Sequence, residues 1–203
     1  MSQIALPLAI RTSDDPTRIV VGNGNQPVVE ALSDPSGWPF RTAVLLGPPR
    51  SGKSLLGRWF EGQGQGDVID GADALDETEL FHRWNRAQED GKPLLLIADR
   101  EAWDIALPDL KSRLGAALHL EIAPPDDDMV AALIESLAGQ RGLALADGAP
   151  TYLVPRATRS YAGIERLVSE IDRLSLERKV PATLAIWRAA LEAIEGPEQA
   201  SLL

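Results

Sequence analysis

The stretch that decides the fold spans residues 47–54 and reads Gly47-Pro48-Pro49-Arg50-Ser51-Gly52-Lys53-Ser54. An apolar run, 42–46, comes directly before it, and a helical pattern begins at Leu55. A strand, a glycine-rich turn and a helix start, in this order, form a phosphate-binding loop. The first amides of a helix lack internal partners and carry the positive end of the helix dipole, so they bind phosphate groups. The stretch therefore predicts a site for a nucleoside phosphate.

The residues of this loop have different roles. The backbone would surround the phosphates, Lys53 would reach the β- and γ-phosphates as a point charge, and the Ser54 hydroxyl would hold Mg²⁺. An accidental match to the spacing is expected in roughly one chain per hundred of this length. The flanking strand and helix favour nucleotide binding over a glycine turn with an exposed lysine. The predicted nucleotide site consists of Gly47, Pro48, Pro49, Arg50, Ser51, Gly52, Lys53, Ser54 and Leu55.

Composition and charge limit the function further. The chain has 203 residues, of which 44% are hydrophobic, enough for one compact domain or for a core with a small appendage. Its 30 Asp and Glu against 20 Lys and Arg give a net charge of −10. Such a surface repels phosphate backbones, so we expect protein partners and no direct nucleic acid contact. The absence of Cys excludes disulfides and thiolate ligands, and two His are too few for a metal cluster.

No targeting or membrane segment is expected. The apolar stretch from Ile4 to Ile10 lacks a basic flank and a small-residue cleavage site, and it contains Pro7. No apolar run in the sequence is long enough to span a bilayer. The sequence is therefore typical of a cytoplasmic protein without a membrane partner.

Strands and helices alternate through the first part of the chain. Apolar runs indicate strands at 42–46, 67–70, 94–98 and 119–122. Helical patterns separate them, and a further helix begins at Pro27. The run 94–98 is apolar throughout, as expected for a strand covered on both faces of a parallel sheet. We therefore predict an α/β core with a parallel sheet over residues 19–123.

From Pro124 onwards the patterns are helical only. Helices are indicated at 129–138, 161–176 and 181–194, with Ser160 as the N-cap of the second. Residues 151–157 are ambiguous between helix and loop. The predicted architecture is a reduced phosphate-loop core followed by a small all-α lid over residues 124–203.

The first 18 residues form a tail of different character. Gln3 precedes the aliphatic residues of Ile4-Ala5-Leu6-Pro7-Leu8, where the proline restricts the free chain. A glutamine before spaced aliphatic residues is typical of a short docking peptide, and an edge strand would give the same pattern. Burial of two leucines contributes roughly 3–6 kcal/mol before ordering costs. The candidate partner-binding residues are Gln3, Leu6, Pro7 and Leu8.

Two carboxylates follow predicted strands. Asp70 ends the run 67–70, and Asp99 follows the run 94–98. The carboxyl ends of parallel strands meet at one edge of a sheet, where α/β proteins bind their ligands. Asp70 is therefore a candidate Mg²⁺ ligand beside Ser54, with a turn-forming role as the alternative. Asp99 is a candidate for the nucleotide site.

Together these motifs resemble the AAA+ class and, within it, the DnaA/Hda branch of bacterial replication initiators and their regulators. The segment 110–114, Leu-Lys-Ser-Arg-Leu, resembles the arginine-finger segment of that branch, and 95–100 resembles its sensor-I strand. Residues 68–70 resemble a short Walker B strand, and the loop 19–26 resembles the adenine-side loop. The tail segment 3–8 is similar to a peptide that binds the sliding clamp. The likeness covers nearly the whole chain.

The resemblance implies how the chain would act. Hda-type members are implied to sit on the DNA-loaded sliding clamp, to bind ADP and to present an arginine to ATP-bound DnaA, which then hydrolyses its nucleotide. The implied cofactors are ADP or ATP with Mg²⁺, with Val21 beside the base and Arg113 as the arginine acting in trans. Such an arginine raises the hydrolysis rate roughly 10³–10⁵-fold. The implied partners are the sliding clamp, DnaA and, in a homo-oligomer, further copies of this chain.

Three features depart from that family. A glycine-rich turn alone separates the loop helix from Asp70, so the sheet should be one strand smaller, and Gly71 stands where an acidic residue often follows. Glu165 stands where the lid's sensor-II arginine is expected, with Arg166 one position on and about 100° around the helix. A carboxylate at this place repels the β-phosphate. We therefore expect at most weak ATP hydrolysis by this chain, with Arg166 as the lid cation.

Two other functions share these features. A self-sufficient ATPase or small-molecule kinase would use Asp70 as metal ligand and Asp99 as base. A structural adaptor would dock on the clamp with a phosphate loop that no longer binds nucleotide. The interpretation we favour is a clamp-docked regulator that restrains replication initiation by activating a partner's ATPase.

Overall fold

The computed structural model describes residues 19–99 and 103–195. The part that contains the sheet runs through α1 (Gln26–Ser33), η2 (Pro35–Gly37), η3 (Pro39–Arg41), β1 (Thr42–Leu46), α2 (Lys53–Gly62), β2 (Asp67–Asp70), η4 (Ala72–Ala74), α3 (Glu77–Glu89), β3 (Leu94–Ile97), α4 (Pro108–Gly115) and β4 (Leu118–Glu121). The helical part consists of α5 (Asp127–Gln140), α6 (Ala149–Leu153), η5 (Val154–Arg156), α7 (Tyr161–Arg178) and α8 (Leu184–Glu195). The predicted partner-binding residues Gln3, Leu6, Pro7 and Leu8, and Arg100, lie outside the described residues.

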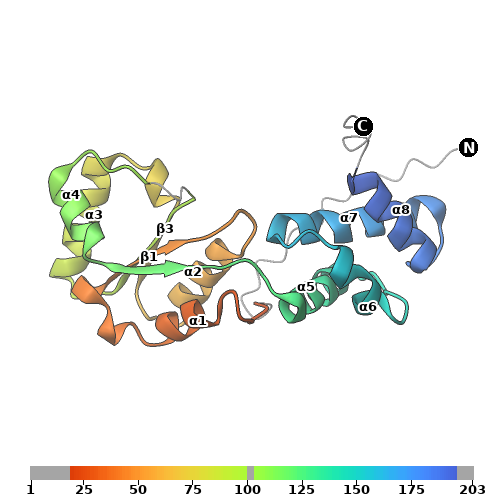
Figure 1. Cartoon of the computed structure of the whole chain (residues 1–203). Helices are drawn as coiled ribbons and strands as arrows, with labels where there is room; N and C mark the ends of the chain where they lie inside the picture. The colour runs from red at the N-terminus through yellow and green to blue at the C-terminus, as the bar shows by residue number, and fades with distance from the viewer. Residues whose placement is uncertain (1–18, 100–102, 196–203) are drawn as a thin grey trace, which may run out of the picture.

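The strands form one parallel sheet in the order β2-β3-β1-β4, which confirms the predicted α/β fold. β1 pairs with β3 from Thr42 opposite Leu94 onwards, and with β4 up to Leu46 opposite Glu121. β3 is buried along its whole length because it has a strand on each side and helices over both faces. The carboxyl ends of the strands lie at one edge of the sheet, and this edge faces the helical part (Figure 1).

Helices cover both faces of the sheet. Side chains alternate along each strand, so Leu45 packs with α1 and α2 whereas Val44 packs with α3 and α4. Phe60 of α2 is fully buried on the first face and stacks on Trp38 at 5.3 Å between ring centroids. On the second face, Trp84 of α3 is buried and donates from Nε1 to Thr42 Oγ1 at the start of β1. The phosphate-loop helix and α4 therefore lie on opposite faces of the sheet.

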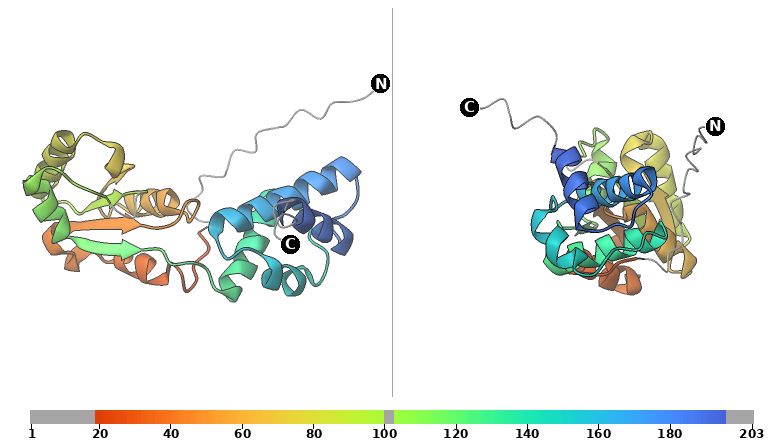
Figure 2. Two further views of the ribbon diagram at one scale, coloured as in Figure 1. Left: turned by 45° about the horizontal axis from the view of Figure 1, so that its top comes forward. Right: turned by 90° about the vertical axis from the view of Figure 1, so that its right-hand side faces the viewer.

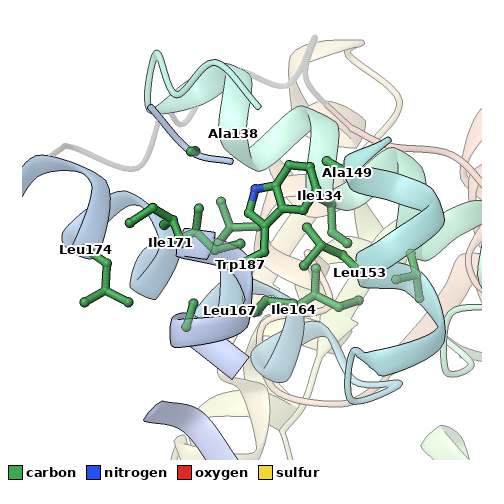
Figure 3. Close-up of a cluster of buried hydrophobic side chains, with 14 residues drawn as sticks. Ile134, Ala138, Ala149, Leu153, Ile164, Leu167, Ile171, Leu174 and Trp187 are labelled. Carbon is green, nitrogen blue, oxygen red and sulfur yellow. The ribbon is translucent and has the colours of Figure 1, made fainter. Parts of the chain in front are cut away.

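The helical part forms a second lobe with a hydrophobic core of its own, beside the carboxyl edge of the sheet (Figure 2). Trp187 of α8 lies at the centre of this core, surrounded by aliphatic side chains of α5, α6 and α7 (Figure 3). α7 begins as predicted, because the Ser160 hydroxyl accepts a hydrogen bond from Gly163 N. The connection from β4 to α5 carries the chain from the sheet into this lobe (Figure 1).

Some details of the helical lobe differ from the sequence-based boundaries. α8 begins at Leu184 rather than at Pro181, because Ala182 pairs with Leu145 in an isolated bridge of extended backbone. The ambiguous residues 151–157 contribute the end of α6 and the turn η5. Among the described residues, no helix combines the length and apolarity needed to cross a membrane.

Candidate nucleotide-binding site

The phosphate loop connects β1 to α2. Its backbone requires glycine at two places, because Gly52 has a φ of +90° and a Cβ on Gly47 would lie 2.9 Å from Ile122 Cβ. Gly52 is also the N-cap of α2, and no side chain caps this helix end. The first amides of α2 are therefore available to an anion. The loop has the form that the sequence motif predicts.

Lys53 is held inside the loop. Its side chain is 7% exposed, and Nζ donates to Gly47 O at 2.7 Å and to Pro48 O at 3.3 Å. Nζ also lies 3.0 Å from Asp99 Oδ1. The structure thus brings together two predicted site residues, Lys53 and Asp99, from the ends of neighbouring strands β1 and β3. The ammonium group lies where a phosphate held by the loop would meet it.

A cleft of about 340 Å³ opens between the loop and the helical lobe, within the size range of roughly 300–1,000 Å³ usual for ligand pockets. Its polar wall includes Lys53, Ser54 and Asp99. Its apolar wall combines residues before α1 with residues of α5: Ile19, Val20, Met129, Leu133 and Leu137. A phosphate cradle beside an apolar wall suits a nucleotide, with the phosphates at the loop and the base against the aliphatic side chains.

The segment before α1 is fixed by a buried amide side chain. Asn25 is 3% exposed, accepts from Gly22 N at 2.9 Å and donates to Val20 O at 2.9 Å. These bonds place Ile19 and Val20 at the cleft. Val21, the residue predicted beside the base, is 53% exposed and is not part of the lining.

The helical lobe contributes two polar contacts at the cleft. Arg50 of the loop donates from Nε and Nη2 to the two carboxylate oxygens of Glu165 on α7. Tyr161 donates from its hydroxyl to Ala123 O at 2.9 Å, which ties the start of α7 to the β4–α5 connection. Burial, and secondarily the negative charge of Asp126, raises the pKa of Tyr161 to about 12. Glu165 lines the cleft, whereas Arg166 is exposed and does not.

The two predicted Mg²⁺ ligands have different positions. Ser54 lines the cleft at the start of α2. Asp70 lies at the carboxyl end of β2, opposite Ile97 of β3, and is exposed outside the lining. Both residues supply oxygen atoms at the carboxyl edge of the sheet, which suits a hard cation. The position of Ser54 fits a Mg²⁺ ion bound together with the phosphates. The role of Asp70 as a Mg²⁺ ligand stays a prediction.

Arg113 lies on α4, across the sheet from α2. Its guanidinium carbon lies 4.4 Å from the centroid of the Trp84 ring and 5.0 Å from that of Phe81, both on α3. The side chain is half-buried and has no carboxylate partner within the described ranges. Arg113 therefore belongs to a surface away from the cleft of its own chain.

The sequence did not identify the residues that α5 contributes. Met129, Leu133 and Gln140 of α5 line the cleft. Their pattern predicts an amphipathic helix, and such a pattern does not say against which element the apolar face packs. Glu165 is the signal in the sequence that the lid carries a carboxylate, and not a cation, at the cleft.

Sequence comparison finds relatives but no family model that matches the chain. DnaA of Thermus thermophilus is 29% identical over 125 residues, which cover 61% of this chain and 29% of that protein. An uncharacterized protein of Haemophilus influenzae is 32% identical over 121 residues, or 57% of this chain and 52% of that protein. The chain thus spans less than a third of the DnaA sequence and about half of the other relative.

Solved structures share the fold at lower identity. Domain III of the Thermotoga maritima replication initiation protein DnaA has a TM-score of 0.73 at 16% identity, covering 89% of this chain and 96% of that one. A replication initiator DnaA bound to AMPPCP and single-stranded DNA has a TM-score of 0.61 at 20% identity, covering 84% of this chain and 69% of that one. These matches include both the sheet and the helical lobe, since each covers more than four fifths of this chain.

Proposed function

Because the chain is a DnaA-related protein of the AAA+ class, we propose that it is a nucleotide-binding regulator of replication initiation. The observation that carries this proposal is the cleft where the phosphate loop, Lys53 and an apolar wall meet. ADP or ATP would place its phosphates at the loop and its base between Ile19 and α5. Mg²⁺ would be held by Ser54, with Asp70 reached directly or through water. The DnaA structure bound to AMPPCP supports an adenine nucleotide.

Arg113 is the residue proposed to act on a partner. It lies on the opposite face of the sheet from α2, so its charge is offered away from the chain's own cleft. The rings of Trp84 and Phe81 position the guanidinium without neutralising it. A DnaA molecule that presented its ATP to α4 would receive an arginine for the charge of the hydrolytic transition state. Docking of residues 3–8 on the sliding clamp would bring the chain to replicating DNA.

One observation favours a second function, that of an adaptor without nucleotide. Lys53 is satisfied by two loop carbonyls and Asp99, and Arg50 is satisfied by Glu165. Both cations of the loop are thus paired within the chain, and a phosphate would have to compete with Asp99 and Glu165 for them. The self-sufficient ATPase or kinase has less support, since Asp70 does not line the cleft.

Direct nucleic acid binding is not part of the proposal. The DnaA structure with AMPPCP is also bound to single-stranded DNA. This chain has a net charge of −10, which opposes contact with a phosphate backbone. Absence of single-stranded DNA binding at low salt would agree with this expectation, and salt-sensitive binding would contradict it.

The test combines calorimetry with a hydrolysis assay. ADP should bind to the isolated chain, and the ADP-bound chain should stimulate ATP hydrolysis by DnaA in the presence of DNA-loaded clamp. Leu6→Ala with Leu8→Ala should abolish clamp binding, whereas Ser13→Ala with Asp14→Asn in the same tail should not. ADP binding without stimulation would refute the regulatory role. Absence of ADP binding would favour the adaptor, and clear turnover by the chain alone would favour the ATPase.

A further inference from the structure

The phosphate loop and the lid are joined by a charged contact between residues 115 positions apart. Arg50 lies in the loop, and Glu165 lies in the second turn of α7. The guanidinium donates from two nitrogens to the two oxygens of one carboxylate, so the pair is bidentate. The Arg50 side chain is 54% exposed and that of Glu165 is 20% exposed. Both residues line the cleft.

The loop backbone at this contact is not in a relaxed conformation. Arg50 has a φ of +65°, in the left-handed region that non-glycine residues rarely adopt. The next residue, Ser51, has a buried hydroxyl without a hydrogen-bond partner among the described residues. Strained backbone and an unsatisfied polar atom persist where other contacts hold them in place. The bidentate pair with Glu165 holds this part of the loop from the lid side, and the hydrogen bond from Ser51 N to Pro48 O holds it from within.

A phosphate would compete with Glu165 for Arg50. A guanidinium binds carboxylate and phosphate oxygens through the same forked geometry. The phosphates of a bound nucleotide would lie beside both residues, at the first amides of α2. Once Arg50 turned to a phosphate, Glu165 would be an unpaired carboxylate next to a polyanion, and like charges repel.

We propose that the side chain of Arg50 is the phosphate-binding cation that Glu165 withholds in the nucleotide-free chain, and that nucleotide binding releases α7 from the loop. This inference rests on the proposed nucleotide site. The expected effect of nucleotide on the lid is the opposite of that in a protein whose lid carries a cation, because phosphates would attract such a lid towards the loop. In this chain the lid carries the carboxylate, so nucleotide loosens the contact between α7 and the core.

Binding measurements test the phosphate role. Glu165→Gln should bind ADP with Mg²⁺ about three- to tenfold more tightly, because the competing charge is gone, and Arg50→Gln should bind it more weakly by a similar factor. The double variant should return close to the wild type. Glu170→Gln and Arg173→Gln are matched controls, since this pair lies on α7 outside the cleft lining. Unchanged or weaker binding by Glu165→Gln would overturn the proposal.

A distance measurement tests the release of α7. The chain has no Cys, so Glu89→Cys in α3 and Arg178→Cys in α7 allow clean labelling of two exposed helix ends for pulsed electron spin resonance. Without nucleotide, Glu165→Gln should broaden the distance distribution while Glu170→Gln leaves it narrow. Nucleotide should shift the wild type towards the Glu165→Gln distribution.

The two experiments separate the two ideas. Unchanged distances in nucleotide-free Glu165→Gln would show that the Arg50–Glu165 pair does not hold α7 on the loop, even where ADP binds normally. Failure of every variant to bind ADP would overturn the phosphate role of Arg50 together with the proposed function. A narrower distance distribution on nucleotide binding would show that nucleotide tightens the contact between α7 and the core, which contradicts the inferred loosening.

Discussion

Lys53 and Asp99 form an ion pair at the mouth of the phosphate loop, with 3.0 Å between Nζ and Oδ1. The two partners differ in exposure, since the Lys53 side chain is 7% exposed and that of Asp99 is 80% exposed. The carboxylate can therefore turn to solvent, while the ammonium group stays in the loop. A phosphate entering the cleft would replace a carboxylate on a cation that is already in position, which limits the reorganisation that binding requires.

Lys53→Ala should weaken ADP binding roughly 10- to 100-fold, because a charge-assisted hydrogen bond to phosphate is lost. Isothermal titration calorimetry measures this directly. Lys92→Ala is the matched control, since Lys92 is exposed and pairs with Asp67 at the amino end of β2, away from the loop. Equal affinity of Lys53→Ala and the wild type would mean that phosphates do not bind at this loop.

Arg113→Ala should abolish the stimulation of DnaA while ADP affinity stays the same. Loss of the contacts with Trp84 and Phe81 should also lower the free energy of unfolding by about 1 kcal/mol, measured by urea denaturation. Lys111→Ala, an exposed cation on the same helix that pairs with Asp104, should leave stimulation unchanged. Full stimulation by Arg113→Ala would exclude the role in trans.

Gly47→Ala should destabilise the chain by about 1–3 kcal/mol, because the new methyl group would lie 2.9 Å from Cβ of Ile122, the residue that follows β4. The same change at Gly115, where a Cβ meets nothing within 4 Å, should be neutral or stabilise α4 by up to about 1 kcal/mol. Thermal denaturation of both variants gives the comparison. Equal melting temperatures would show that the loop can move away from β4 at little cost.

Tyr161→Phe should lower the free energy of unfolding by about 1 kcal/mol near neutral pH, because the hydrogen bond to Ala123 O is lost. Burial raises the pKa of Tyr161 from 10.0 to about 12. Between these two pH values the folded state therefore holds a proton that the unfolded state releases. The stability that this tyrosine contributes is complete below pH 10 and is lost as pH rises towards 12.

Urea denaturation at several pH values measures this dependence. The stability difference between the wild type and Tyr161→Phe should shrink over that pH interval. Tyr152→Phe is the control, since Tyr152 packs on Trp187 inside the helical lobe. A constant difference between the wild type and Tyr161→Phe would mean that the hydroxyl ionises as freely as in the unfolded chain.

The sequence by itself determined the class of fold and the phosphate loop. The apolar residues of β3 predict a strand buried on both faces, and the spacing of Gly47, Gly52 and Lys53 predicts the turn into α2. These features are local, since they depend on backbone conformation and on which residues of one element are apolar. For the same reason the N-cap at Ser160 was predictable, whereas the start of α8 depended on a distant pairing of Ala182.

Only the tertiary structure decided which side chains meet. It brought Glu165 to Arg50 across 115 positions, placed Met129 over the cleft, and set Arg113 on the ring of Trp84. The sequence predicts that the carboxylate of Glu165 repels a bound β-phosphate, and the structure shows that Arg50 neutralises this carboxylate. Periodicity states that a helix face is buried but not against what, because the partner is chosen by the packing of whole elements.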